Sequence, residues 1–215
     1  GVWTVPDFRN RAKALQRRGG QLVVIDPRRT ETAKIADRHL FIRPATDGLL
    51  LVALLKAVLT HPERPALPDY IDNLDAVAEA VSGFDSGACA AQCGVALPDI
   101  EWLADRMVTG PAALYGRIGA ATQSFGTLNA WLIGLINIAS GQLDREGGLL
   151  FPTPLVDTVA MAGPGSVGRR HSRVSGHPLV MGEYPAAALA EEIETPGEGQ
   201  IKALFVVAGN PVLST

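Results

Sequence analysis

The chain contains little cysteine. Only Cys89 and Cys93 occur among its 215 residues, and their spacing, without a second pair, does not make a zinc site. An iron–sulfur cluster normally needs about four thiolates, so this chain cannot build one alone. On a helix the two cysteines would lie one turn apart, which is typical of small buried thiols. Few cysteines and no signal-like start indicate a reducing, cytoplasmic setting.

Long hydrophobic runs and an excess of charge of one sign are also lacking. The longest apolar runs, 48–55 and 131–139, are shorter than the roughly 20 residues that span a membrane, so we expect no membrane insertion. The net charge of −3 gives no overall basic field for nucleic acid. With 47% hydrophobic and 19% charged residues, the composition is that of a globular protein with a substantial core.

Positive charge is concentrated near the start of the sequence. It has two interpretations, a solvated helix face or a basic flank beside a phosphate-bearing ligand. The residues concerned are Arg9, Arg11, Lys13, Arg17, Arg18, Arg28 and Arg29.

The stretch 20–51 has the pattern of an open α/β sheet. Two apolar runs, 22–25 and 40–42, are each followed by a proline and an aspartate, and a polar turn with a short helix over 30–36 lies between them. Ligands of such folds bind in the crevice outside the carboxyl ends of the strands. The sequence therefore predicts a binding site where these two runs end.

Strands and helices alternate along the rest of the chain. This alternation predicts an α/β fold with a doubly wound, mostly parallel Rossmann-like sheet flanked by helices. We expect a single domain over 1–215, with a long irregular excursion over 146–200 before the last strand. Asp7 and Asp47 are expected to cap helices. Further β-like runs are 111–115 and 201–207, and helical patterns cover 8–18, 47–61, 69–81, 98–107, 124–142 and 185–193.

Three polar residues follow predicted strands, namely Asp26, Asp47 and Asn210. A carboxylate there can accept both N–H groups of a guanine edge or two hydroxyls of a ribose. An asparagine offers a donor and an acceptor to a phosphate or a base. Singly, each is a typical turn former, since Asp-Pro and Asn-Pro favour turns. Because all three residues follow strands at equivalent places in one predicted sheet, a ligand-binding role and a turn-forming role are equally supported.

Other motifs do not support catalysis. The run 163–168, GPGSVG, has the spelling of a dinucleotide fingerprint, but its second residue is proline and no helix pattern follows it. The histidines show no metal spacing, and Glu191 and Glu192 are expected to be solvated on an amphipathic helix. We therefore predict no catalytic residue and no metal ligand in this chain.

Three stretches carry a family resemblance. They read IDPRRTETAKIADRHLFIRPATD, GRIGAATQSFGTLNAWLIGLINIASGQLDREGGLLF and IKALFVVAGNPVLS. In order and spacing they resemble the molybdopterin oxidoreductase family, whose members carry bis-molybdopterin guanine dinucleotide and include formate dehydrogenases, nitrate reductases and dimethyl sulfoxide reductase. The resemblance covers most of the chain and is weakest over 152–200.

The resemblance implies a cofactor site. In that family the corresponding segments hold one guanine nucleotide tail of the cofactor, while electron or oxygen-atom transfer takes place at molybdenum or tungsten. The residues implied in binding are Asp26, Pro27, Arg28 and Thr30 along the nucleotide, Thr46 and Asp47 at the ribose or guanine, Gly119 and Thr122 near the pterin, and Asn210 at a phosphate or base.

The sequence also departs from the family. Ala45 stands where the family usually has glycine, so a turn with positive φ would be strained. The glutamine often found in the second segment falls at Thr122 or at Gln123. The family's N-terminal cysteine cluster, metal ligand and C-terminal cofactor domain have no counterpart here. We expect an internal fragment, inactive alone, of an enzyme whose iron–sulfur cluster lies in the missing N-terminal part.

Alternatives to a molybdopterin enzyme remain. The same fold serves as a cofactor-free scaffold in the large peripheral subunit of respiratory complex I. An ordinary nucleotide-binding domain is disfavoured because no Gly-rich phosphate loop fits. The expected partners are the remaining domains of the parent enzyme and an electron-transfer subunit or carrier. A scaffold does not need polar groups at strand ends, and this chain keeps Asp26, Arg28, Thr30, Asp47 and Asn210.

Overall fold

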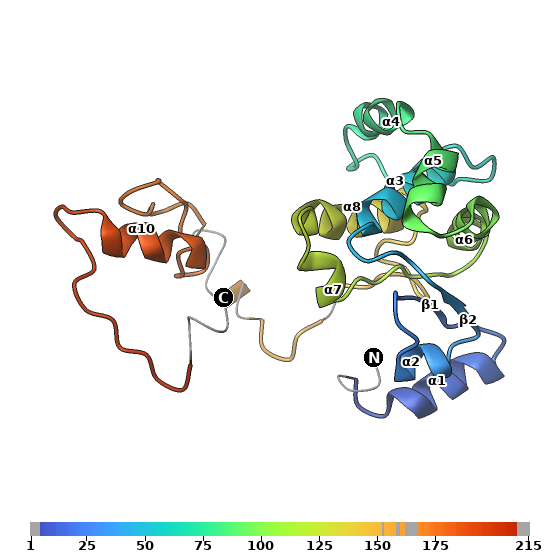
Figure 1. The fold of residues 1–215 in the computed structure, drawn as a ribbon, viewed down its shortest axis with the longest axis horizontal. Helices are drawn as coiled ribbons and strands as arrows, with labels where there is room; N and C mark the ends of the chain where they lie inside the picture. Colours follow the sequence, from blue (N-terminus) through green and yellow to red (C-terminus); the bar gives the residue numbers. More distant parts are fainter. Residues whose placement is uncertain (1–4, 152, 158–159, 162–166, 210–215) are drawn as a thin grey trace. The chain divides into compact units, whose positions relative to one another are not determined.

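The fold was analysed in a computed structural model that describes residues 5–151, 153–157, 160–161 and 167–209. The chain divides into two compact units, one over residues 1–151 and the other over residues 152–215. Figure 1 shows the course of both.

The first unit contains a small parallel sheet. Strand β1 (Val23–Ile25) pairs with β2 (Arg38–Leu40), and the short helix α2 (Glu31–Lys34) connects them. In Figure 1 the sheet lies between α1 (Phe8–Arg17) and α2 on one side and a layer of longer helices on the other. The predicted strand 22–25 is confirmed as β1.

Strand β2 begins two residues before the predicted run 40–42, so that prediction was wrong in its bounds. The polar residues Arg38 and His39 occupy the strand because their side chains find partners. Arg38 forms an ion pair with Asp99 and lies 4.4 Å over the Trp102 ring. His39 Nε2 lies 3.0 Å from Asp26 O. Apolar pattern alone could not show these contacts.

Helix α3 (Asp47–Leu59) is the centre of the helical layer. Its sequence is apolar nearly all round, and Leu54, Leu55 and Val58 are at most 1% exposed. Figure 1 shows α3 among its neighbours. These are α4 (Leu74–Ser82), α5 (Ser86–Cys93), α6 (Leu97–Thr109) and α8 (Gly126–Ala139).

The predicted β-run 111–115 forms no strand, so that prediction was wrong. Amide side chains take the place of a neighbouring strand. Asn137 accepts from Leu114 N at 3.0 Å and donates to Leu114 O at 2.9 Å, while Gln142 accepts from Ala112 N at 3.3 Å. Buried polar groups require such partners, which explains two polar residues in an otherwise apolar stretch.

The two predicted helix caps are not formed. Asp7 precedes α1 with a φ of 56°, and its side chain accepts from Asn10 Nδ2 instead of from the helix main chain. Asp47 is the first residue of α3, and Thr46 is its N-cap. Asp47 is therefore free to point its carboxylate at another element.

The second unit contains a 3-10 turn η2 (Ala186–Ala188) and helix α10 (Leu189–Glu194), which confirms the helix predicted over 185–193. Glu191 and Glu192 were predicted to be solvated, but both side chains also accept hydrogen bonds from the protein. Glu192 accepts from Arg173 N at 2.6 Å and Arg173 Nε at 3.0 Å, and Glu191 accepts from Ser175 N at 3.2 Å. These bonds hold the loop before α10 on the helix.

The predicted strand 201–207 has no strand partner in the described part of the chain. Phe205 is 91% exposed and Val207 is 88% exposed. A strand needs a neighbour to accept its main-chain hydrogen bonds.

The described fold is helix-rich with a small parallel sheet, an α/β class in the broad sense. Within the described residues, no helix combines the length and apolarity needed to cross a membrane.

Candidate functional site

The turn that joins β2 to α3 carries two of the predicted site residues, Thr46 and Asp47. It contains a left-handed residue, Ala45, with a φ of 63°. The alanine therefore adopts the positive φ that glycine adopts more easily, which is the strained form of the turn considered from the sequence. Thr46 Oγ1 donates to Arg43 O at 2.7 Å, which closes the turn.

The Asp47 carboxylate is bonded to a residue far away in the sequence. Gln123 Nε2 donates to Asp47 Oδ2 at 2.8 Å and to Gly119 O at 2.7 Å. Gly119 lies in α7 (Ile118–Ala121), so this segment borders Asp47. Thr122 instead donates its hydroxyl to Ile118 O at 2.9 Å, back into α7. Of the two residues considered for the family glutamine, Gln123 is the one that reaches Asp47.

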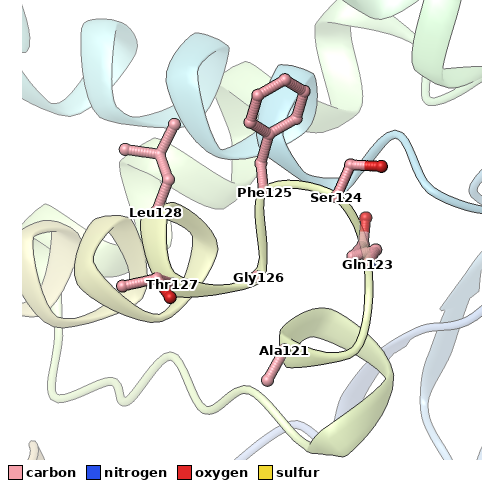
Figure 2. Close-up of a pocket in the computed structure, with 7 residues that line it drawn as sticks. All are labelled: Ala121, Gln123, Ser124, Phe125, Gly126, Thr127 and Leu128. Atoms are coloured by element: carbon pink, nitrogen blue, oxygen red, sulfur yellow. The ribbon is translucent and has the colours of Figure 1, made fainter. Parts of the chain in front are cut away.

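The turn between α7 and α8 forms an open hollow of about 350 Å³. Figure 2 shows Phe125 and Leu128 projecting from the same side of this turn, with Gln123 and Ser124 beside them. Phe125 is 68% exposed. The hollow is lined by Ala121, Gln123, Ser124, Phe125, Gly126, Thr127 and Leu128.

A buried acceptor lies next to the first turn of α3. Asn129 is fully buried, and its Nδ2 donates to Ala120 O at 2.9 Å. Its Oδ1 has no hydrogen-bond partner among the described residues. A Cβ added to Gly48 would lie 3.1 Å from this oxygen, so Gly48 allows the close approach. Asn129 thus keeps an unsatisfied buried acceptor next to Gly48.

The end of β1 is organised differently. Asp26 Oδ1 accepts from Arg28 N at 2.8 Å, which is a local Asx turn, and Thr30 Oγ1 accepts from Ala33 N at 3.2 Å as the N-cap of α2. Pro27 and Arg28 are exposed. These four predicted residues form one loop, but their side-chain bonds are those of a turn and a helix cap.

The basic residues near the start of the sequence lie on α1 and on this loop. Arg9 Nη2 is 3.1 Å from Glu31 Oε2. Arg17, Arg18, Arg28 and Arg29 are exposed. The arrangement is compatible with both interpretations of the basic residues. Asn210, the last predicted site residue, lies outside the described residues.

Two titratable groups have shifted pKa values, and neither is a predicted site residue. Hydrogen bonds from Leu22 N and Gln16 lower the pKa of Asp37. Burial, together with the neighbouring Cys93, raises the pKa of Cys89, and both thiols are free and buried on α5 as expected. In the described part of the chain, no cluster of three or more His, Cys, Asp or Glu residues could hold a metal.

The arrangement around Asp47 can bind but has no evident means to catalyse. Its carboxylate accepts from the Gln123 amide and offers further lone pairs to N–H donors of a ligand. The unsatisfied Asn129 carbonyl oxygen lies buried next to Gly48. Sequence reasoning missed Asn129 and left Gln123 open beside Thr122, although both Gln123 and Asn129 lie in the second stretch that carries the family resemblance.

The chain is similar to known proteins over most of its length. It is 28% identical to the nitrate reductase of Klebsiella oxytoca over 99% of this chain and 26% of that protein. It is 26% identical to the assimilatory nitrate reductase catalytic subunit of Bacillus subtilis over 92% of this chain and 30% of that protein. The chain therefore spans less than a third of the length of these relatives. No family model matches.

A third relative and a solved structure agree with these. The assimilatory nitrate reductase of Haloferax mediterranei is 34% identical over 58% of this chain. The fold is similar to that of acetylene hydratase from Pelobacter acetylenicus, with a TM-score of 0.60 and 22% identity over 66% of this chain and 20% of that one. These relatives support the resemblance of the chain to the molybdopterin oxidoreductase family.

Proposed function

We propose that this chain is the part of a molybdenum or tungsten oxidoreductase that holds one guanine nucleotide tail of bis-molybdopterin guanine dinucleotide. The observation that carries the proposal is the bond between Asp47 and Gln123, which joins the end of β2 to the α7–α8 turn. When bound, the cofactor supplies electron or oxygen-atom transfer at its metal. The chain's own residues bind and orient its nucleotide.

The guanine is assigned to Asp47. With Oδ2 engaged by Gln123, a carboxylate still has the lone pairs to accept from guanine N–H groups. The bond to Gln123 fixes the carboxylate in one orientation before a ligand arrives, which reduces the entropy cost of binding. Thr46 and Gly119 border the same place, and Thr122 holds α7 in shape.

The phosphates are assigned to the loop that follows β1. Arg28 is exposed there, beside the Asx turn of Asp26 and the cap residue Thr30, and Pro27 fixes the loop. Guanidinium groups bind phosphate oxygens strongly. Asn210 would add a further contact to a phosphate or a base.

The remaining features of the parent enzyme belong to the same proposal. The two parallel strands would be part of a doubly wound sheet in a single domain, for which the apolar run 201–207 supplies further strand-forming sequence. The partners would be the other domains of the enzyme and an electron carrier, in the cytoplasm. An iron–sulfur cluster would be held by sequence outside this chain.

One observation favours the cofactor-free scaffold instead. The side chains of Asp26 and Thr30 are used in a turn and a helix cap, so they need no ligand to explain them. The bond between Asp47 and Gln123 needs a different account, because a scaffold gains little from a carboxylate tied to a glutamine beside an open hollow.

Calorimetric titration of this chain with GMP and GDP, and with AMP as the control ligand, tests the proposal. Guanine-selective binding is expected, and Asp47→Asn is expected to abolish the selectivity, because an amide offers one acceptor atom where a carboxylate offers two. Asp85→Asn is the matched control, since Asp85 caps α5 by accepting from Ala88 N at 2.6 Å and asparagine caps equally well.

Equal affinities for GMP and AMP would contradict the proposal. A folded chain that binds neither is tested again with the flanking sequence found in its relatives restored. If the longer chain also fails to bind guanine nucleotides, the scaffold alternative stands.

A further inference from the structure

The turn between β2 and α3 contains a residue with a strained main-chain conformation. Ala45, with a φ of 63°, lies in a region that residues other than glycine rarely adopt. Such residues persist where surrounding contacts hold them, and they cluster at binding sites. Thr46 and Asp47 follow directly. The orientation of the Asp47 carboxylate therefore depends on whatever holds this turn.

Arg43 connects the turn to the end of α5. Its Nη1 donates to Ala91 O at 2.7 Å and to Gln92 O at 2.8 Å, and its main-chain N donates to Cys93 O at 2.8 Å. Carbonyl groups at a helix end lack partners within the helix, and this end carries partial negative charge. The Arg43 guanidinium donates to these carbonyl groups and its positive charge complements that of the helix end. Arg43 is therefore anchored on α5, which packs into the core.

The other side of Ala45 is bonded to Arg43 as well. Thr46 Oγ1 donates to Arg43 O at 2.7 Å. Thr46 O in turn accepts from Leu49 N at 3.1 Å and from Leu50 N at 3.4 Å, in the first turn of α3. Hydrogen bonds thus run from α5 through Arg43 and Thr46 to the helical turn that carries Asp47.

We propose that Arg43 is a positioning residue for the site, which anchors the strained turn on α5 and thereby sets the place of the Asp47 carboxylate. The identity of the ligand rests on the proposed function. The positioning itself is a property of the nucleotide-free chain, so it can be measured separately.

Three substitutions separate positioning from general stability. Arg43→Met removes the donors and keeps an apolar stem. Arg43→Lys keeps the charge, and lysine can reach two carbonyl groups, as Lys56 does in this chain with Ser82 O at 2.9 Å and Phe84 O at 2.7 Å. Lys56→Met is the matched control, because it removes the same kind of contact at the other end of α3.

The readouts are amide hydrogen exchange over residues 44–50 without nucleotide and the affinity for GMP by calorimetry. Arg43→Met is expected to raise exchange in this segment and to weaken GMP binding about tenfold. Arg43→Lys is expected to restore most of both, and Lys56→Met to change neither.

Ala45→Gly tests the role of strain. Glycine adopts positive φ freely, so the loss caused by Arg43→Met is expected to be smaller in the Ala45→Gly background. If Arg43→Met does not fold, Arg43→Gln with and without Ala45→Gly provides the same comparison, because the shorter amide is neutral and does not reach the end of α5. Strictly additive effects on exchange would overturn the proposal.

Unchanged exchange over 44–50 in Arg43→Met would also overturn it, as would an equal effect of Lys56→Met. Raised exchange together with no GMP binding by the unsubstituted chain would support the positioning role and count against the proposed function. The two proposals therefore fail in different ways.

Discussion

The two strand ends of the first unit look alike in sequence and differ in structure. Each is followed by a proline and an aspartate. After β1, the Asp26 side chain accepts from a main-chain N two residues away. After β2, the Asp47 side chain accepts from Gln123, 76 residues away. The first aspartate shapes its own loop, and the second links two distant elements.

This difference shows what a strand-end carboxylate can mean. Aspartate after a strand is a common turn former, and at Asp26 that role accounts for its bond. At Asp47 the carboxylate does not cap its helix, because Thr46 occupies the N-cap position and the Asp47 side chain accepts from Gln123 instead. A side chain that its own turn does not use is the better candidate for a ligand.

The largest expected effect is on nucleotide affinity. Asp47→Asn is expected to weaken GMP binding roughly ten- to a hundredfold, since hydrogen bonds to charged groups contribute about 1.5–3 kcal/mol. Asp26→Asn is expected to cost several-fold less, because asparagine can keep the Asx turn. Calorimetry on both variants measures the comparison, and equal losses would erase the distinction between the two strand ends.

The α7–α8 turn carries Gln123, the partner of Asp47, and it can be disturbed directly. A Cβ added to Gly126 would lie 1.8 Å from Ala121 O, so Gly126→Ala is expected to destabilise the fold by about 1–3 kcal/mol. Gly134→Ala on the same helix is the control, because nothing lies within 4 Å of its Cβ and alanine favours helix. Urea unfolding distinguishes them. Equal stabilities would mean that the turn relaxes freely.

The first strand end is expected to respond only locally. Thr30→Ala removes the cap of α2 and should cost about 1 kcal/mol in the free energy of unfolding. Thr30→Ser keeps the hydroxyl and should cost much less. Denaturant titration gives both values, and a serine variant as unstable as the alanine variant would show that the cap is not the cause.

The smallest expected effect depends on pH. Hydrogen bonds from Leu22 N and Gln16 lower the pKa of Asp37 in the folded chain, so folding favours the ionised carboxylate. The resulting stability is present above the unfolded pKa, about 3.9, and is lost as pH falls through the folded value. Asp37→Asn should therefore lower the Tm slightly at pH 7, and the difference should vanish in strong acid. A constant difference across that range would assign the effect to packing.

Local patterns predicted the local features. The apolar runs of α3 and α8 and the spacing of the two cysteines are short-range signals, and the structure confirms them. The glycine usually found at Ala45 raised the possibility of a turn with positive φ, and Ala45 has a φ of 63°. Each of these predictions rests on residues close together in the chain.

Contacts between distant residues could not be predicted in the same way. The partner of Asp47 is Gln123 and the anchor of Arg43 is the end of α5, and neither follows from spacing. The shift of β2 has the same origin, because Arg38 is accommodated in the strand by Asp99 on α6. The ligand at the site is likewise a prediction from resemblance and geometry.

The amides that line the run 111–115 occupy main-chain groups with which a further strand could otherwise pair. An extended segment with open main-chain groups is a template on which another molecule can add a strand, and this is a common route to aggregation. Here Asn137 occupies both main-chain groups of Leu114, and Gln142 occupies Ala112 N. Those positions are closed to a second chain without the cost of building a further strand.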